Sequence, residues 1–145
     1  MICSKFHIIT LLAAMALLIP SCATSSKGKK VGLKDTHWVC VQELFVADAG
    51  TQTETYTIDF VSADECVVKN KSVLPAHPAT YVNPDGSIDT IPERKSESVS
   101  RAKWVSRYGK LILQLEDGTT RVLELKNGKL EGPGPYGEEM VFEKQ

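Results

Sequence analysis

Two cysteines and two histidines carry most of the reactive chemistry in the later part of the sequence, at Cys40, Cys66, His37 and His77. Side chains of these two types are the ligands of many structural zinc sites. The spacing argues against such a site, because His37 and Cys40 stand three apart and successive side chains of a strand alternate between its faces. We therefore expect no metal site, and surface or loop positions for both histidines.

Cys40 and Cys66 could instead form a disulfide. The bridge would enclose about 26 residues and, on the chain-entropy account, would stabilise the fold by roughly 3–4 kcal/mol. Two buried free thiols are the other interpretation. The sequence leaves both open, because a disulfide depends on the distance and direction between two Cβ atoms.

Motifs for catalysis and for phosphate binding are missing. The sequence contains no Gly-x-Ser-x-Gly elbow, no P-loop and no Gly-x-Gly-x-x-Gly. A glycine-rich run at residues 132–137 includes prolines, which lack the N–H donors that a phosphate cradle needs. We expect a turn there, no cofactor and a non-catalytic protein.

The first residues have the pattern of an export signal. Lys5 precedes an apolar run at residues 8–19, which is too short to span a bilayer but fits the central region of a signal peptide. The run leads into Ile-Pro-Ser-Cys, with the cysteine at position 22. This arrangement resembles the cleavage site of bacterial lipoproteins. The resemblance implies a signal peptide at residues 1–21 and a lipidated Cys22.

Attachment to a bilayer would follow from that lipid. Acyl chains contribute about 0.8 kcal/mol per buried methylene, so several of them hold a protein on a membrane. The small and polar residues 22–33 then form a flexible tether. Because residue 23 is alanine and not aspartate, the lipoprotein resemblance implies retention at the outer membrane, and we expect the periplasmic face.

Composition leaves one small domain after this tether, at residues 34–145. The chain has 145 residues, of which 42% are hydrophobic and 24% are charged, and its formal net charge is -1. That length supports a single domain. A near-neutral charge argues against a nucleic-acid-binding protein, which usually shows a basic excess.

Alternating apolar and polar residues predict successive β-strands in this domain. Tyr56, Ile58 and Phe60 share one strand face, and Asp-Gly and Asn-Gly pairs at residues 117–118 and 127–128 predict tight hairpins. Short hairpins favour an antiparallel meander, and about seven to nine strands in this length fit a small closed barrel. A two-sheet sandwich is the alternative. The large apolar residues that we expect inside are Trp38, Tyr56, Ile58, Phe60, Trp104, Leu111, Leu113 and Leu115.

One long connection, at residues 75–94, interrupts the meander. Asn-Pro-Asp-Gly at residues 83–86 predicts a hairpin inside it, in which residues 80–82 pair with residues 87–91. Binding residues concentrate on loops that a rigid scaffold holds. We therefore expect this segment to flank one end of the barrel, with Tyr81 as a contact for a ligand or partner.

The order of these features resembles the small lipocalin-like lipoproteins of bacterial envelopes. A tryptophan opens the first strand after Lys-Asp-Thr-His, and a Tyr-x-Ile-x-Phe strand, a long loop, a Trp/Tyr strand and leucine-rich hairpins follow. The resemblance implies an anchored binding module for a small apolar or amphipathic ligand or an envelope protein, with Trp38 and Trp104 as further contacts. A structural role in envelope maintenance, with a filled core, is the alternative.

Overall fold

A computed structural model of the chain describes residues 32–145, so the expectations about residues 1–21 and Cys22 lie outside the described residues. The described part contains strands and no helix. The strands are β1 (Thr36–Val46), β2 (Gly50–Phe60), β3 (Glu65–Leu74), β4 (His77–Pro78), β5 (Thr90–Ile91), β6 (Arg94–Arg107), β7 (Lys110–Leu115), β8 (Thr120–Lys126), β9 (Lys129–Pro133) and β10 (Glu139–Lys144).

Eight of these strands close into a barrel in the order β1-β10-β9-β8-β7-β6-β3-β2. Every neighbouring pair is antiparallel, and β2 pairs with β1 to complete the ring. The predicted all-β meander barrel is therefore confirmed. The remaining strands, β4 and β5, form a separate two-stranded hairpin between β3 and β6.

Tight turns with left-handed backbone join the shorter strands. Asn127 and Gly128 have φ angles of 50° and 79°, and Tyr108 and Gly109 have φ angles of 53° and 78°. Two successive residues with positive φ make the hairpin turn whose twist matches that of the flanking strands. The Asn-Gly signal read from the sequence thus marks the connection between β8 and β9.

Large apolar side chains fill the barrel. Leu113 and Leu130 are fully buried, and the rings of Phe60 and Trp104 meet edge to face with centroids 5.3 Å apart. Leu33 also lies in this core, so the packed domain includes one residue that we had assigned to the tether. The remaining core residues are Trp38, Cys40, Tyr56, Ile58, Cys66, Val68, Ala102, Leu111, Leu115, Leu123, Met140 and Phe142.

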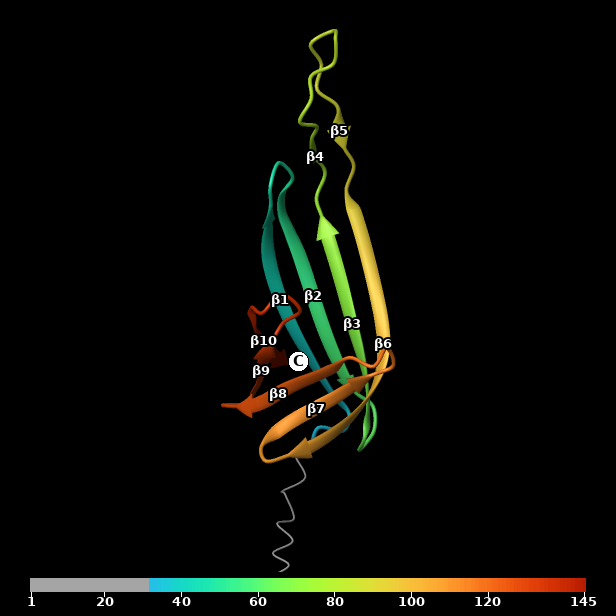
Figure 1. Ribbon diagram of the computed structural model, residues 1–145, viewed down its shortest axis with the longest axis vertical. Helices are drawn as coiled ribbons and strands as arrows, with labels where there is room; N and C mark the ends of the chain where they lie inside the picture. The colour runs from blue at the N-terminus through green and yellow to red at the C-terminus, as the bar shows by residue number, and fades with distance from the viewer. Residues whose placement is uncertain (1–31) are drawn as a thin grey trace, which may run out of the picture.

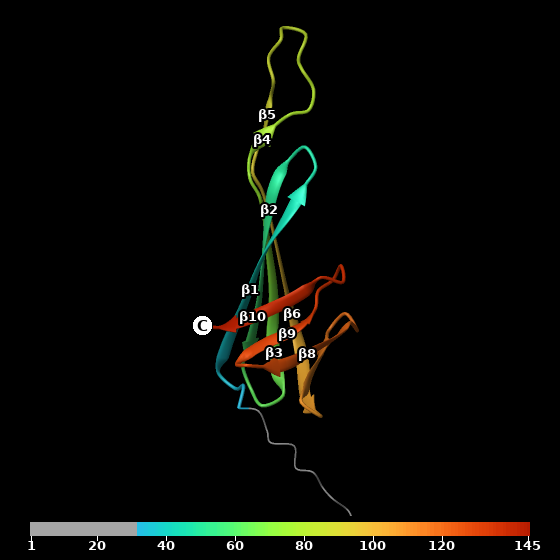
Figure 2. The ribbon, with the colours of Figure 1, turned by 90° about the vertical axis from the view of Figure 1, so that its left-hand side faces the viewer.

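Four long strands, β1, β2, β3 and β6, continue past the barrel as a single projecting sheet (Figure 1). The ladder between β1 and β10 ends at Val39, and the ladder between β6 and β7 begins only at Ala102. Beyond these points, residues 41–46 and 94–100 pair on one side only. The side view shows this sheet rising in one layer from the barrel, with the β4–β5 hairpin at its far end (Figure 2).

The projecting sheet is the largest departure from the sequence-based expectations. The parts of β2 and β6 that project beyond the barrel have the sequences Gly-Thr-Gln-Thr-Glu-Thr and Arg-Lys-Ser-Glu-Ser-Val-Ser. These segments are mostly polar on both faces, so they lack the alternation of apolar and polar residues that marks a strand in a sequence. Alternation becomes visible only where one face enters the core. The strands therefore extend further than their apolar parts predicted.

A hairpin does form within residues 75–94, but its position differs from our expectation. The regular pairs are His77 with Ile91 and Pro78 with Thr90, whereas residues 80–82 join no ladder. The hairpin also stands away from the barrel, and the expectation that it flanks a barrel end is wrong (Figures 1 and 2). The reason is that β3 and β6 stay paired as far as Leu74 and Arg94, which carries the connection outward.

Candidate functional site

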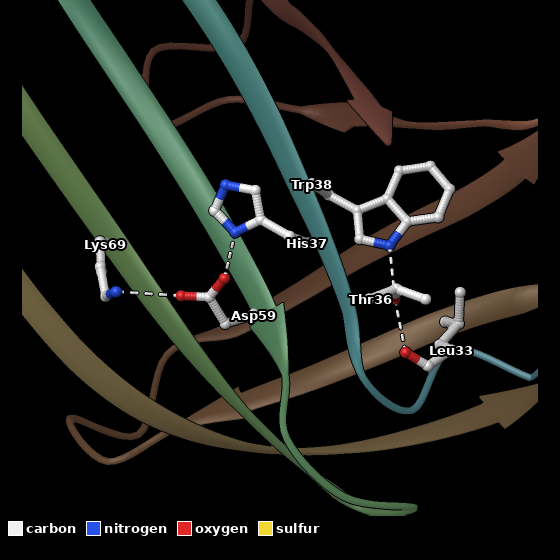
Figure 3. Close-up of polar contacts among 6 residues, drawn as sticks. All are labelled: Leu33, Thr36, His37, Trp38, Asp59 and Lys69. Atoms are coloured by element: carbon white, nitrogen blue, oxygen red, sulfur yellow. Dashed lines mark hydrogen bonds and ion pairs between the residues drawn. The ribbon is translucent and has the colours of Figure 1, made fainter. Parts of the chain in front are cut away.

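Both tryptophans that we had expected as contacts lie inside the packed barrel. Trp38 is buried on β1 and Trp104 is buried on β6. The Trp38 indole nitrogen donates a hydrogen bond of 2.8 Å to the Thr36 hydroxyl, which in turn donates to the Leu33 carbonyl (Figure 3). This chain of bonds fixes the start of β1 against the core. A ligand could touch these rings only by displacing core side chains.

Cys40 and Cys66 are free, buried thiols in the structure. Cys66 on β3 lies opposite Phe60 on β2, which in turn lies opposite Thr36 on β1. Thr36 is four residues from Cys40 along β1. The two cysteines are therefore separated by four residues along the strands and by the width of β2 across the sheet. That offset is about 13 Å along the strands and about 10 Å across the sheet, whereas disulfide Cα atoms lie within about 7 Å. The barrel therefore holds them in the free-thiol arrangement, the second of the two interpretations.

Burial also makes these thiols weak nucleophiles. Burial raises the pKa of Cys66 to about 12. Burial likewise raises the pKa of Cys40, and the backbone hydrogen bond from Val141 offsets part of the rise. Since the thiolate is the reactive form, neither side chain is suited to covalent chemistry in the folded barrel.

A polar trio lies on the outer face of the barrel at His37, Asp59 and Lys69 (Figure 3). The Asp59 carboxylate accepts a hydrogen bond from His37 Nδ1 and forms an ion pair of 3.0 Å with Lys69 Nζ. Partial burial alone would raise the pKa of Asp59, but these two contacts outweigh it and hold the pKa below its ordinary value. The trio joins β1, β2 and β3, so it contributes to the sheet.

Tyr81 lies in the outer hairpin and is exposed over 57% of its surface. Its hydroxyl donates to Asp89 across the hairpin at 3.3 Å. Asn83 closes the tip through side-chain bonds to Ser87 and Asp89. The residue is accessible, as expected, but it lies between β4 and β5, and this hairpin stands at the far end of the projecting sheet (Figure 1).

Two depressions stand out among the residues that the structure describes. The larger, of about 650 Å³, crosses β3, β6 and β7 beside the turns that follow β2 and β7, and it is lined both by outward residues such as Val67 and Lys103 and by the core residues Cys66, Ala102 and Leu115. The second, of about 450 Å³, crosses β7 to β9 beside charged side chains. Arg101, Lys103 and Arg107 are exposed on the outer face of β6.

Within residues 32–145, no three His, Cys, Asp or Glu side chains gather closely enough to hold a metal ion. No helix in the described part of the chain is long and apolar enough to cross a membrane.

The most exposed apolar residue of the long strands lies on β1. Phe45 is exposed over 83% of its surface and Val41 over 60%, and both point to the outer face of the projecting sheet. They lie beyond the last ladder pair between β1 and β10. Backbone N–H and C=O groups of an unpaired strand edge are a template for another strand. Residues 41–46 of β1, which pair with β2 but with no second strand in the described part of the chain, are the candidate binding edge.

Sequence reasoning missed this edge, although one signal was present. The segment Trp-Val-Cys-Val-Gln-Glu-Leu-Phe-Val at residues 38–46 is apolar on both faces and lacks clean alternation. In an antiparallel barrel the outer face is usually polar. The apolar residues on the outer face of β1 therefore indicated a contact surface.

Comparisons of the chain with protein families, with curated proteins and with solved structures find no match.

Proposed function

We propose that this chain is a lipid-anchored envelope lipoprotein, on the periplasmic face of the outer membrane, whose barrel is a non-catalytic module that binds another protein. The lipid-anchor part rests on the sequence, with Lys5, the apolar residues 8–19 and Cys22 in lipoprotein order. The protein-binding part rests on one structural observation. That observation is the exposed edge of β1 carrying Phe45, which has no strand partner on its outer side within residues 32–145.

A filled core favours a protein partner over a small ligand inside the barrel. Barrels of about eight strands are near the size at which side chains alone fill the interior. The rings of Phe60, Trp104 and Phe142 occupy this one, together with fully buried leucines. The barrel is then a rigid support, and recognition takes place on the sheet that projects from it.

The partner that fits the binding edge is an extended segment of another protein. Such a segment adds a strand through main-chain hydrogen bonds, and side chains on alternate positions give specificity. Val41, Glu43 and Phe45 alternate on the outer face of β1. An incoming strand with apolar residues on either side of a lysine or arginine would match them.

Pairing with a second copy of this chain fits less well. Residues that lie opposite each other in an antiparallel pair point to the same face. If the edges of two copies pair about their middle residue, Glu43 of one copy lies opposite Glu43 of the other. Like charges placed directly opposite destabilise a strand pair. The other free edge, on β6, carries Arg94, Lys95 and Glu97, and charged side chains of this kind protect an edge from pairing.

The anchor is tested by intact-mass analysis of the chain extracted from membranes. We expect a chain that begins at Cys22 and carries the added mass of acyl groups, and a soluble form for Cys22→Ser. A Cys22→Ser protein that stays in the membrane at the normal amount would contradict the anchor.

The binding edge is tested by photo-crosslinking in intact cells. A benzoylphenylalanine at position 45 is expected to give one dominant adduct, whose crosslinked peptide comes from an extended segment of a second protein. The same reagent at Val99, on the outer face of β6, is the matched control and should not give that adduct. Adducts formed only between copies of this chain, or equal adducts at both positions, would rule out the proposed partner.

A further inference from the structure

A second polar feature lies on the inner face of the sheet, where the projecting strands leave the barrel core. Gln42 on β1 lies opposite Glu54 on β2, and Asn70 on β3 lies opposite Tyr56 on β2. All four alternate along their strands with outward residues, and Tyr56 is itself a core residue. These side chains form a polar layer directly above the apolar filling of the barrel. We call this layer, Gln42, Glu54, Tyr56 and Asn70, the polar mouth.

Three oxygen atoms of the polar mouth are buried and accept no hydrogen bond from any residue between 32 and 145. They are Oε1 of Gln42, Oε2 of Glu54 and Oδ1 of Asn70. Glu54 is only 6% exposed, and its other oxygen accepts a bond of 2.5 Å from Gln52 Nε2. Leaving a buried acceptor unsatisfied costs about 1–3 kcal/mol, and more when it is charged. Such a set of acceptors indicates a bound group that donates.

The orientation of the Gln42 amide is determined by a neighbour. Its Nε2 donates to the Glu139 carbonyl at 3.3 Å, which leaves Oε1 on the side away from β10. The free oxygen of Gln42 and the free oxygen of Glu54 are therefore both acceptors, and neither can supply the donor that the other lacks. The missing donor must come from outside this pair.

The charge around the polar mouth is predominantly negative. Burial, followed by the charges of Glu54 and Glu138, raises the pKa of Tyr56 to about 12, and Arg121 only partly opposes them. One carboxylate oxygen of Glu138 accepts the Tyr136 N–H at 2.9 Å, and within the described residues its other oxygen is buried without a hydrogen-bond partner. Glu54, supported by the nearby charge of Glu138, is the carboxylate of the polar mouth that would meet a cation.

We propose that the polar mouth binds a primary ammonium group. An ammonium group carries three donors and one positive charge, which match three unsatisfied acceptors of which one is a carboxylate. The rest of the ligand would leave along the inner face of the projecting sheet, past serine hydroxyls. In the strand register Ser72 lies opposite Glu54, Ser98 lies opposite Asn70, and Ser96 lies opposite Ser72. A free alkylamine and a lysine side chain of a peptide share this chemistry.

The test is calorimetric titration of the full chain, purified from membranes in a non-ionic detergent. The probes are n-butylammonium, for a free amine, and Nα-acetyl-lysine N-methylamide, for a lysine side chain, with n-butanol as the neutral match. We expect saturable binding of at least one amine and none of n-butanol. The amine that binds more tightly identifies the source.

Glu54→Gln keeps the size of the side chain and removes its charge. We expect it to weaken amine binding at least tenfold while the midpoint of thermal unfolding stays the same or rises. Glu97→Gln, which changes an exposed carboxylate on the outer face of β6, is the control and should bind as the original chain does. If Glu54→Gln does not fold, Asn70→Ser replaces it, with a smaller loss of binding expected.

Three results would overturn the proposal. These are no amine binding by the original chain, equal binding of n-butanol and n-butylammonium, and equal amine binding by the Glu54→Gln or Asn70→Ser variant and the original chain. The crosslinking experiment at Phe45 concerns the other face of the sheet, so either proposal can fail without the other.

Discussion

Trp104 combines a large buried surface with an indole nitrogen that finds no hydrogen-bond partner among the residues that the structure describes. Its ring meets Phe60 edge to face across the barrel interior, so removing it would leave a cavity that the closed strands cannot fill. We expect Trp104→Ala to lower the free energy of unfolding by about 3–5 kcal/mol in urea. Tyr136→Ala, at an exposed aromatic ring, should change it by about 0.5 kcal/mol or less. Equal losses for the two variants would place Trp104 outside the core.

Asp59 should make the barrel sensitive to acid. Its pKa is lower in the folded chain than in the unfolded chain, because His37 and Lys69 stabilise the carboxylate. The contribution of a carboxyl group with a lowered pKa is complete above its unfolded value and disappears as the pH falls through its folded value. We expect Asp59→Asn to cost about 1 kcal/mol or less near pH 7.

This cost should shrink as the pH of the unfolding experiment is lowered through the folded-state pKa of Asp59, because the carboxyl group then becomes protonated in the folded chain as well as in the unfolded chain. Glu116→Gln, at an exposed carboxyl group on the turn after β7, is the comparison and should show no such pH dependence. A cost for Asp59→Asn that stays constant across the whole acid range in which the chain remains folded would mean that its contacts act through packing and not through charge.

The two thiols should remain separate and unreactive. Alkylation of the unfolded chain without a reducing agent is expected to modify Cys40 and Cys66 fully, and alkylation of the folded chain at pH 8 is expected to be slow because burial disfavours both thiolates. Peptide mass analysis measures each site. Recovery of a peptide in which Cys40 and Cys66 are joined would contradict the barrel register.

At the level of the strands, Gly132 allows β9 to approach β8. A Cβ atom built at Gly132 would lie 2.6 Å from the Val122 carbonyl oxygen and from a Leu123 methyl group. The first of these is backbone and cannot move without breaking the sheet. Gly132→Ala should therefore destabilise the fold by about 1–3 kcal/mol. Gly32→Ala is the control, because nothing lies within 4 Å of a Cβ atom built there. If Gly132→Ala lowers the free energy of unfolding no more than Gly32→Ala does, β9 can shift away from β8.

Strands that enter the core were predictable from the sequence, because one face of each carries an apolar period of two. Tyr56, Ile58 and Phe60 are the clearest case, and all three are buried. The polar halves of β2 and β6 were not predictable, since cross-strand pairing rather than burial defines them. The outward position of the β4–β5 hairpin depends on that pairing, so the sequence could not place it.

The polar mouth was equally hidden in the sequence. Gln42, Glu54 and Asn70 stand far apart along the chain, and each is a polar residue of a type that is common at exposed strand positions. Only the register, which sets β1, β2 and β3 side by side, shows that the three share the inner face. A buried carboxylate cannot be recognised before the faces of its strand are known.

At the scale of the whole molecule, two parts of one sheet have different roles in this account. The lower part curls into a closed barrel with a filled core, and the upper part projects as an open sheet with free edges (Figures 1 and 2). The closed part has no edges to protect. The open part carries the exposed apolar residues of β1, and we propose that it contacts the partner while the lipid at Cys22 keeps the domain at the membrane.

The central claim is that the barrel supports a binding surface and does not contain a ligand. Titration of the unlipidated Cys22→Ser chain with lauric acid, followed by the emission of Trp38 and Trp104, tests it most directly because both indoles lie in the core. We predict no saturable change in emission, since the interior is occupied by side chains. Saturable quenching at one lauric acid per chain would contradict this and would make the barrel a container for apolar ligands.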